Sequence, residues 1–187
     1  HERGIHRRMR IRLVDNADFD GIAAILRPYV EKTAIHFAAT APTADELRAE
    51  WEQSRSRFAT LVAEVDGSIV GFAKASTFRT RAAYRWSAEI GVYVDDAHHR
   101  RGIARALYER LIAMCRAQGF HVLIAGIALP NDASVKLHEA LGFAHTGTFR
   151  EIGFKLGHFH DVGFWTLPLS SSTGAPPSTL KTPLEVA

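Results

Sequence analysis

The segment 92–118 constrains the fold of this chain most strongly, because an apolar strand there leads through a short polar loop directly into a helix. The strand pattern ends at Val94, the polar loop covers 95–101, and helical spacing then continues up to Gly119. One face of this helix is apolar and carries Ile103, Ala106, Leu107, Leu111 and Met114. The segment therefore predicts a strand–loop–helix unit of an α/β fold.

The start of this helix has the properties of a site for an anion. Backbone N–H groups in the first turn of a helix are free, and the helix dipole adds a positive partial charge. Gly102 and Ala104 would let phosphate oxygens approach the main chain, and Arg100, Arg101 and Arg105 add positive charge. The loop is neither a P-loop nor a three-glycine dinucleotide fingerprint. Taken alone, the arginines fit a solvated basic cap equally well.

The rest of the chain alternates between strand and helix periodicity. Thr43 and Glu46 form a capping-box pattern, and Asp66-Gly67 is a hairpin turn between two apolar runs. The predicted elements are a strand at 10–14, helices at 18–29 and 43–57, hairpin strands at 60–65 and 68–75, a strand at 86–94, the helix at 102–118, a strand at 122–128, a helix at 131–141 and a short strand at 164–167. This order predicts a mixed α/β sheet covered by helices.

The two ends of the chain differ in composition from its centre. Residues 1–9 show no clear periodicity and end at Met9, which looks like a natural start, so we expect a tag or a flexible extension. From Ser170 onward Ser, Thr and Pro dominate, so burial cannot offset the entropy of ordering. We therefore predict one folded domain at 10–169 and a disordered tail at 170–187.

Charge and composition exclude several classes of protein. The net charge is only +3 and the basic residues gather in short clusters, which favours local anion sites over a nucleic-acid surface. No apolar run reaches eighteen residues, and the N-terminus lacks the apolar stretch of a secretory signal. The single cysteine, Cys115, lies on the apolar side of a helix without a nucleophile signature. These features predict a cytoplasmic protein that binds neither nucleic acid nor membrane.

Glu89 is a candidate general base, because it is a carboxylate within the otherwise apolar run 87–94. Burial there would raise its pKa toward the range in which a carboxylate can take up a proton. An alternating strand could instead point Glu89 at solvent. The paired histidines His98-His99 and His158-x-His160 lack further ligands at the spacing of a structural zinc site, so we expect no metal.

Short motifs follow one another in a fixed order between residues 10 and 168. His99, Gly102 and Ala104 match a Gln/Arg-x-x-Gly-x-Gly/Ala signature, with His in the first position. The other matches are Leu61–Val65 with Gly67, Ala83-Tyr84 with Trp86, Glu89 with Val92–Val94, Leu129–Asp132 with Ser134, Leu137–Phe143 and His160–Trp165. Together they resemble the phosphinothricin and methionine sulfoximine N-acetyltransferase group of the GCN5-related N-acetyltransferase (GNAT) superfamily.

This resemblance implies a GNAT fold, in which helices flank a mixed, mostly antiparallel sheet, and acetyl-CoA as co-substrate. It implies that the loop cradles the pyrophosphate of coenzyme A and that the preceding strand contacts the pantetheine arm. The implied cofactor-binding residues are Val92, Tyr93, Val94, His99, Arg100, Arg101, Gly102, Ile103, Ala104, Arg105, Asn131 and Ser134. The segment 131–134 is also an ordinary helix cap, and both uses can coexist.

The resemblance also implies which residues act on the substrates. Glu89 would be the base, and His138 would be a base, the acid that protonates the leaving thiolate, or a structural residue. The acceptor amino acid would contact Phe37, Arg79, Arg81, Tyr84 and Tyr108, and Tyr108 could equally be a core residue. Three positions depart from the usual pattern of the group, namely Thr40, Gly91 and Phe154.

The function that the resemblance implies is transfer of an acetyl group to the amine of phosphinothricin, methionine sulfoximine or methionine sulfone, by direct attack in a ternary complex. Such an activity would serve herbicide or antibiotic resistance, and members of the group are commonly homodimers. The alternative is a non-catalytic CoA-binding or regulatory module of the same fold. Retention of both Glu89 and His138 argues against that alternative.

Overall fold

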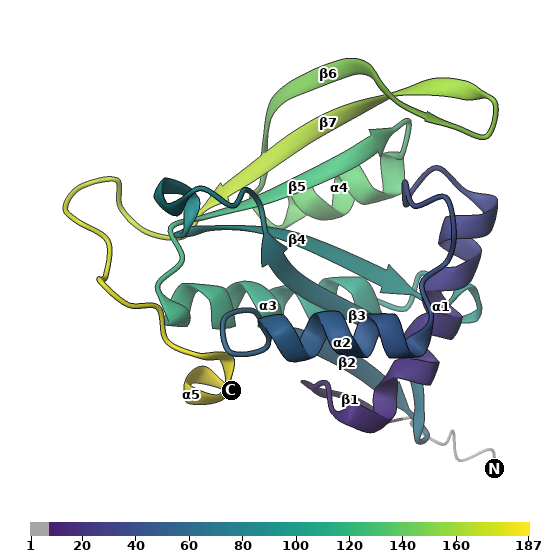
Figure 1. The fold of residues 1–187 in the computed structure, drawn as a ribbon, viewed down its shortest axis with the longest axis horizontal. Helices are drawn as coiled ribbons and strands as arrows, with labels where there is room; N and C mark the ends of the chain where they lie inside the picture. The colour runs from purple at the N-terminus through teal and green to yellow at the C-terminus, as the bar shows by residue number, and fades with distance from the viewer. Residues whose placement is uncertain (1–7) are drawn as a thin grey trace, which may run out of the picture.

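The computed structural model describes residues 8–187 and has one seven-stranded sheet with the order β1-β2-β3-β4-β5-β7-β6 (Figure 1). The strands are β1 Met9–Leu13, β2 Thr60–Val65, β3 Ser68–Thr77, β4 Ser87–Val94, β5 Val122–Leu129, β6 Ala144–Lys155 and β7 His158–Pro168. The α-helices are α1 Phe19–Lys32, α2 Ala44–Ser54, α3 Ile103–Gln118, α4 Asp132–Ala140 and α5 Pro183–Val186. The pairing is antiparallel except between β4 and β5. The predicted mixed, mostly antiparallel sheet is thus confirmed.

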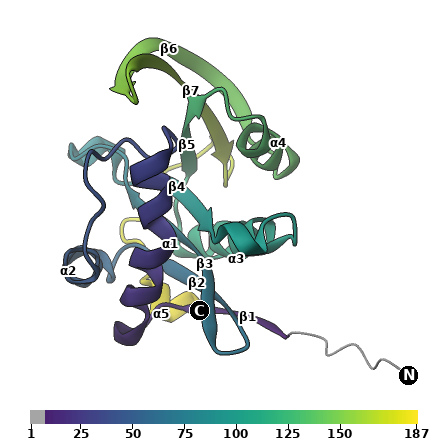
Figure 2. The same ribbon diagram turned by 90° about the vertical axis from the view of Figure 1, so that its right-hand side faces the viewer.

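Helices cover both faces of the sheet. Figure 2 shows α1 and α2 on one side and α3 and α4 on the other. Side chains of β4 alternate between the two faces, so Ala88 and Ile90 pack with the apolar side of α3, whereas Tyr93 packs with the residues under α1. Glu89 shares the face of Tyr93, and this alternation places its carboxylate on the α1–α2 side.

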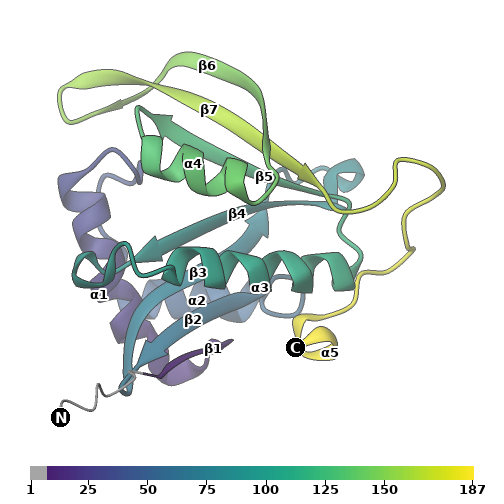
Figure 3. The ribbon, with the colours of Figure 1, turned by 180° about the vertical axis from the view of Figure 1, so that it is seen from behind.

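The sheet opens between β4 and β5. Their paired register covers only Ser87–Glu89 against Val122–Ile124, while β3 pairs with β4 up to Val94 and β7 pairs with β5 up to Leu129. The two strands diverge beyond Glu89, as seen from behind in Figure 3. The facing edges of 90–94 and 125–129 therefore do not pair with each other as strands, which leaves room for an extended ligand.

Two residues predicted from the sequence to cap helices do so in the structure. The Thr43 side chain accepts a hydrogen bond from the Glu46 N–H at the start of α2, and Gly119 ends α3 in the left-handed region.

Cys115 of α3 is fully buried, and burial raises the pKa of its thiol to about 12. Within residues 8–187, no helix is both long and apolar enough to cross a membrane.

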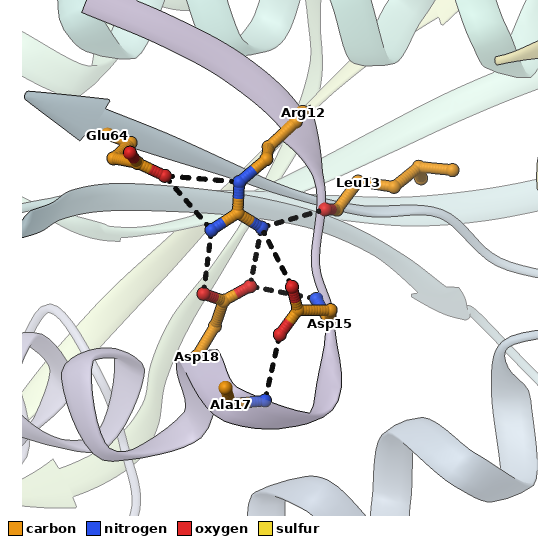
Figure 4. Close-up of polar contacts among 6 residues, drawn as sticks. All are labelled: Arg12, Leu13, Asp15, Ala17, Asp18 and Glu64. Atoms are coloured by element: carbon orange, nitrogen blue, oxygen red, sulfur yellow. Dashed lines mark hydrogen bonds and ion pairs between the residues drawn. The ribbon is translucent and has the colours of Figure 1, made fainter. Parts of the chain in front are cut away.

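An ion-pair network joins β1 to the start of α1 (Figure 4). The guanidinium of Arg12 donates to both carboxylate oxygens of Asp18, at 2.7 and 2.8 Å, and also to Glu64 of β2. The Asp15 N–H donates to Asp18 as well. Burial opposes the ionisation of Asp18, but these hydrogen bonds outweigh it and hold the pKa of Asp18 below its ordinary value. The network fixes α1, which covers the Glu89 face of the sheet.

The β6–β7 hairpin is longer than the sequence pattern predicts. A strand was expected only at 164–167, yet β6 spans Ala144–Lys155 and β7 begins at His158. The edge strand β6 exposes most residues on both of its faces, so it has no polar–apolar alternation to reveal it. Its register against β7 is also interrupted by two irregularities, after His145 and after Phe149.

The C-terminal segment 170–187 was expected to be disordered, whereas the structure has it packed against the end of α3. The Trp86 indole donates to the Pro177 carbonyl, and the Gln118 side-chain amide donates to the Lys181 carbonyl. Pro183 is buried in the short helix α5. These contacts offset the entropy cost of ordering the segment, and its composition alone does not predict them. At the other end Met9 begins β1, while the rest of the expected extension, 1–7, lies outside the described residues.

Candidate active site

A cavity of about 710 Å³ lies on the α1–α2 face of the sheet. Its walls come from α1, α2, the loop after α1, and strands β3, β4 and β5. Its polar lining residues include His36, Glu50, Lys74, Ser76, Thr77, Glu89 and Tyr93. Apolar side chains such as Phe19, Leu26, Trp51 and Phe72 complete it. The cavity therefore combines an apolar wall with a few polar groups, as small-molecule sites do.

Glu89 contributes the one carboxylate that the sheet places in this cavity. Two small residues flank it, Gly91 on the same strand and Gly126 on β5, and both also line the cavity. A Cβ atom on Gly126 would lie 3.7 Å from Glu89 Oε1, so the carboxylate reaches across to β5 where the two strands begin to separate. Burial raises the pKa of Glu89, and Lys74 opposes this increase. Glu89 is thus partly buried in the cavity, and its role as a base stays a prediction.

His36 and Lys74 line the same cavity and were missed by sequence reasoning. The His36 ring accepts a hydrogen bond from the Ala38 N–H at Nδ1, so its neutral form carries the proton on Nε2. Burial lowers the pKa of His36, and the nearby Lys155 and Lys74 lower it further. The Lys74 ammonium lies 3.3 Å from Glu50 Oε1 of α2. No local motif marks these residues, because helix, loop and strand bring them together only in the fold.

The predicted anion site lies at the start of α3. Gly102 is the N-cap residue with φ 75°, has no side-chain capping bond, and a Cβ there would meet no atom within 4 Å. Arg100 and Arg101 are exposed, Ile103 is buried, and Ala104 follows it in the first turn. The first N–H groups of α3 therefore remain open to a ligand.

Two residues of the predicted phosphate loop have partners within the protein. His99 Nε2 lies 3.0 Å from the Val94 carbonyl and 2.9 Å from the Tyr29 hydroxyl, so its ring fastens the loop to β4 and α1. The Arg105 guanidinium donates to Glu109 one turn along α3. His99 is therefore exposed but held by β4 and α1, and among the described residues Arg100 and Arg101 are the cations of this loop without a hydrogen bond or ion pair.

His138 and Tyr108 form a buried pair on the other face of the sheet. His138 Nδ1 lies 2.7 Å from the Ser134 carbonyl, which can only accept, and Nε2 lies 3.2 Å from the Tyr108 hydroxyl. Burial lowers the pKa of His138 and raises that of Tyr108 well above its ordinary value. Asn131 accepts from the Ser134 N–H as the N-cap of α4. Tyr108 is thus a core residue that does not line the cavity with Glu89.

The residues expected to contact the acceptor lie away from the cavity lining. Phe37 is exposed and its ring packs on Gly153 of β6. The Arg79 guanidinium lies over the Phe78 ring, and Tyr84 meets the same ring edge-on. Arg81 is exposed nearby. The loop that carries these last residues follows Thr77, the last residue of β3, which does line the cavity, but none of the four expected side chains does.

Comparison with known proteins finds acetyltransferases by sequence similarity. A family model described as an acetyltransferase (GNAT) domain matches residues 11–163. The chain is 42% identical over 159 residues to a phosphinothricin N-acetyltransferase of Streptomyces viridochromogenes, covering 85% of this chain and 87% of that protein. It is 36% identical over 163 residues to an L-methionine sulfoximine/L-methionine sulfone acetyltransferase of Salmonella typhimurium, covering 86% and 95%.

The fold is similar to solved acetyltransferase structures. A GNAT superfamily phosphinothricin acetyltransferase from Sinorhizobium meliloti, solved in complex with acetyl-CoA, superposes with a TM-score of 0.88 at 31% sequence identity. The superposition covers 92% of this chain and 95% of that one. The similarity therefore extends over nearly the whole chain.

Proposed function

The chain belongs to the GNAT family of acetyltransferases, and we propose that it transfers the acetyl group of acetyl-CoA to the amine of a small amino acid. Phosphinothricin, methionine sulfoximine and methionine sulfone are the candidate acceptors, because similar proteins are named for them. The observation that carries the proposal is the position of Glu89, a half-buried carboxylate in a cavity at the point where β4 and β5 separate.

The start of α3 and the unpaired edge of β4 have the properties expected of an acetyl-CoA site. The uncapped start of α3, with Gly102 and the exposed Arg100 and Arg101, would hold the pyrophosphate through main-chain N–H groups and positive charge. The edge of Val92–Val94 that does not pair with β5 would hold the pantetheine arm by backbone hydrogen bonds other than at the Val94 carbonyl, which already has Tyr29 and His99 as partners, with Asn131 and Ser134 near the start of α4. When bound, acetyl-CoA supplies an activated thioester carbonyl.

Glu89 would act as the general base. An amine must lose a proton before its nitrogen can attack a carbonyl, and most amino acids carry an ammonium group at neutral pH. Because burial raises the pKa of Glu89, its ionised form is a stronger base than an exposed carboxylate. The rate should consequently fall as the pH drops through this raised pKa. The absence of side chains at Gly91 and Gly126 would leave room for the acceptor beside the carboxylate.

His138 would act through Tyr108. The Ser134 carbonyl fixes the proton of neutral His138 on Nδ1, so Nε2 accepts from the Tyr108 hydroxyl. This favours a role for His138 in orienting Tyr108 over a direct proton transfer at Nε2. Phe37, Arg79, Arg81 and Tyr84 remain candidates for contacts with the acceptor, and the homodimer and cytoplasmic location remain predictions.

An acceptor screen tests the proposed function. Release of free thiol from acetyl-CoA is measured with phosphinothricin, methionine sulfoximine and methionine sulfone, and coenzyme A binding is measured by calorimetry. We expect acetyl-CoA-dependent turnover with at least one acceptor. Binding of coenzyme A without turnover on any amine would instead support a non-catalytic module. The absence of both would overturn the proposal.

A further inference from the structure

The charges around the cavity are unevenly distributed. Of the described residues that line it, Glu50 and Glu89 are acidic, and Lys74 is the one lysine or arginine. His36 also faces the cavity, but burial and two nearby lysines lower its pKa and favour the neutral ring. An acceptor with an acidic side chain would therefore find two carboxylates and a single compensating cation.

Lys74 stands close to Glu89 along the sheet. On the facing strands Glu89 pairs with Ser76 and Lys74 pairs with Gly91, so Lys74 is diagonal to Glu89 and faces a residue without a side chain. Diagonal neighbours on two paired strands are about 7–8 Å apart. This is about the distance from the amine of an amino acid to an acidic group at the end of a side chain with two methylenes. An acceptor whose amine is at Glu89 can thus bring that group to Lys74.

The ion pair between Lys74 and Glu50 is weak. Its ammonium lies 3.3 Å from Glu50 Oε1, and the two side chains are 35% and 61% exposed. Half-exposed pairs of this kind contribute little stability, because water and salt screen them. An anion entering the cavity could displace Glu50 at small cost, and the pair would keep the ammonium in place until then.

We propose that Lys74 is a specificity-determining residue, which binds the acidic group of the acceptor's side chain in competition with Glu50. The enzyme then prefers amino acids that end in a phosphinate or carboxylate over neutral ones of the same shape. This inference rests on the proposed function, because it assigns the class of acceptor for the same site.

Phosphinothricin and methionine sulfone differ mainly in the charge of the group that ends the side chain. Phosphinothricin ends in a methyl phosphinate anion, and methionine sulfone ends in a neutral methyl sulfone of the same shape. The measured quantity is the ratio of kcat/KM for phosphinothricin to kcat/KM for methionine sulfone. Because both acceptors share the amine and the α-carboxylate, a change in this ratio reports the side-chain subsite alone.

The two partners of the pair should act in opposite directions. Lys74→Met should lower the ratio about tenfold or more, since a charge-assisted hydrogen bond is lost, and Lys74→Arg should restore part of it. Glu50→Gln should raise the ratio by about twofold to fivefold, because the competing carboxylate is gone. Lys181→Met and Glu52→Gln remove the same charges outside the cavity lining and should leave the ratio unchanged.

The outcomes separate this inference from the proposed function. If Lys74→Met leaves the ratio within twofold of wild type while turnover persists, the inference is overturned and the acetyltransferase stands. If Lys74→Met and Glu50→Gln both lower the ratio, the pair is structural and the inference again fails. If wild-type protein acetylates no amine, the proposed function falls and the inference falls with it.

Discussion

The Nε2 atom of His138 lies 3.2 Å from the hydroxyl oxygen of Tyr108, thirty residues earlier in the chain, in the buried interior of the protein. The ring is fixed from its other side by the Ser134 carbonyl, 2.7 Å from Nδ1. Both partners of the imidazole are thus protein groups, and burial favours the neutral ring although the hydrogen bond to the Ser134 carbonyl opposes this effect. This arrangement makes the stability of the fold sensitive to pH.

Replacing His138 should remove part of that sensitivity. Because burial lowers the pKa of His138, the unfolded chain takes up a proton near pH 6.5 before the folded protein does. Wild-type protein should therefore lose stability, relative to His138→Gln, as the pH falls below about 6.5. Urea unfolding from pH 8 to pH 5 measures the difference. Parallel stability curves would show that His138 is not held neutral by the fold.

The pair of Arg12 and Asp18 makes a separate stability prediction. Asp18→Asn should lower the free energy of unfolding by about 2–3 kcal/mol at pH 7, because the partly buried guanidinium of Arg12 loses its ionised partner. Since the pKa of Asp18 is lowered in the folded state, this contribution is complete above about pH 4 and is lost as the pH falls through the folded pKa. Asp20→Asn, an exposed neighbour on α1, is the control and should have little effect. Equal losses in the two variants would contradict the role of the network.

Gly102 offers a test of the proposed phosphate site. Gly102→Ala forces a side chain into the left-handed region, at a cost of about 1–2 kcal/mol, and should shift the loop and weaken acetyl-CoA binding. Gly67→Ala is a matched control, because Gly67 in the β2–β3 turn has φ 80° and equally open surroundings. We expect similar losses of thermal stability in both variants, but a higher acetyl-CoA Kd only in Gly102→Ala. Unchanged acetyl-CoA affinity in both would remove the loop from the binding site.

The packed C-terminal segment can be tested by truncation. A chain ending at Ser170 lacks the Trp86–Pro177 and Gln118–Lys181 hydrogen bonds and the buried Pro183. Their loss should cost roughly 2 kcal/mol, which lowers Tm by about 4–8 °C in a chain of this size. An unchanged Tm would instead favour the disorder that the composition predicts.

The fold was predictable wherever one face of an element is buried. The helix α3 and the hairpin around Asp66-Gly67 combine a clear period with strong turn residues, and their positions agree with the sequence prediction. The strand β6 was missed, because an edge strand that is exposed on both faces has no alternation to detect. Packing of the C-terminal segment depends on a few contacts such as Trp86 with Pro177, which composition does not reveal.

Within the site, only residues that carry a local signal in the sequence were predictable. Glu89 stands out because a carboxylate within an apolar strand is a local signal. His36 and Lys74 have no such signal, since a loop, a strand and a helix must first fold together to form the cavity. The acceptor residues Phe37, Arg79, Arg81 and Tyr84 were inferred by resemblance and stay predictions, because none of them lines the cavity that holds Glu89.

Glu89→Gln tests the central claim most directly, because it removes the charge of the proposed base and keeps its size. The measurement is kcat for acetyl transfer to phosphinothricin, with the acetyl-CoA Kd determined on the same protein by calorimetry. We predict that kcat falls at least about 100-fold, as expected for loss of a general base, while Kd stays within about twofold. A kcat within a few-fold of wild type, at unchanged Kd, would contradict the assignment of Glu89 as the base.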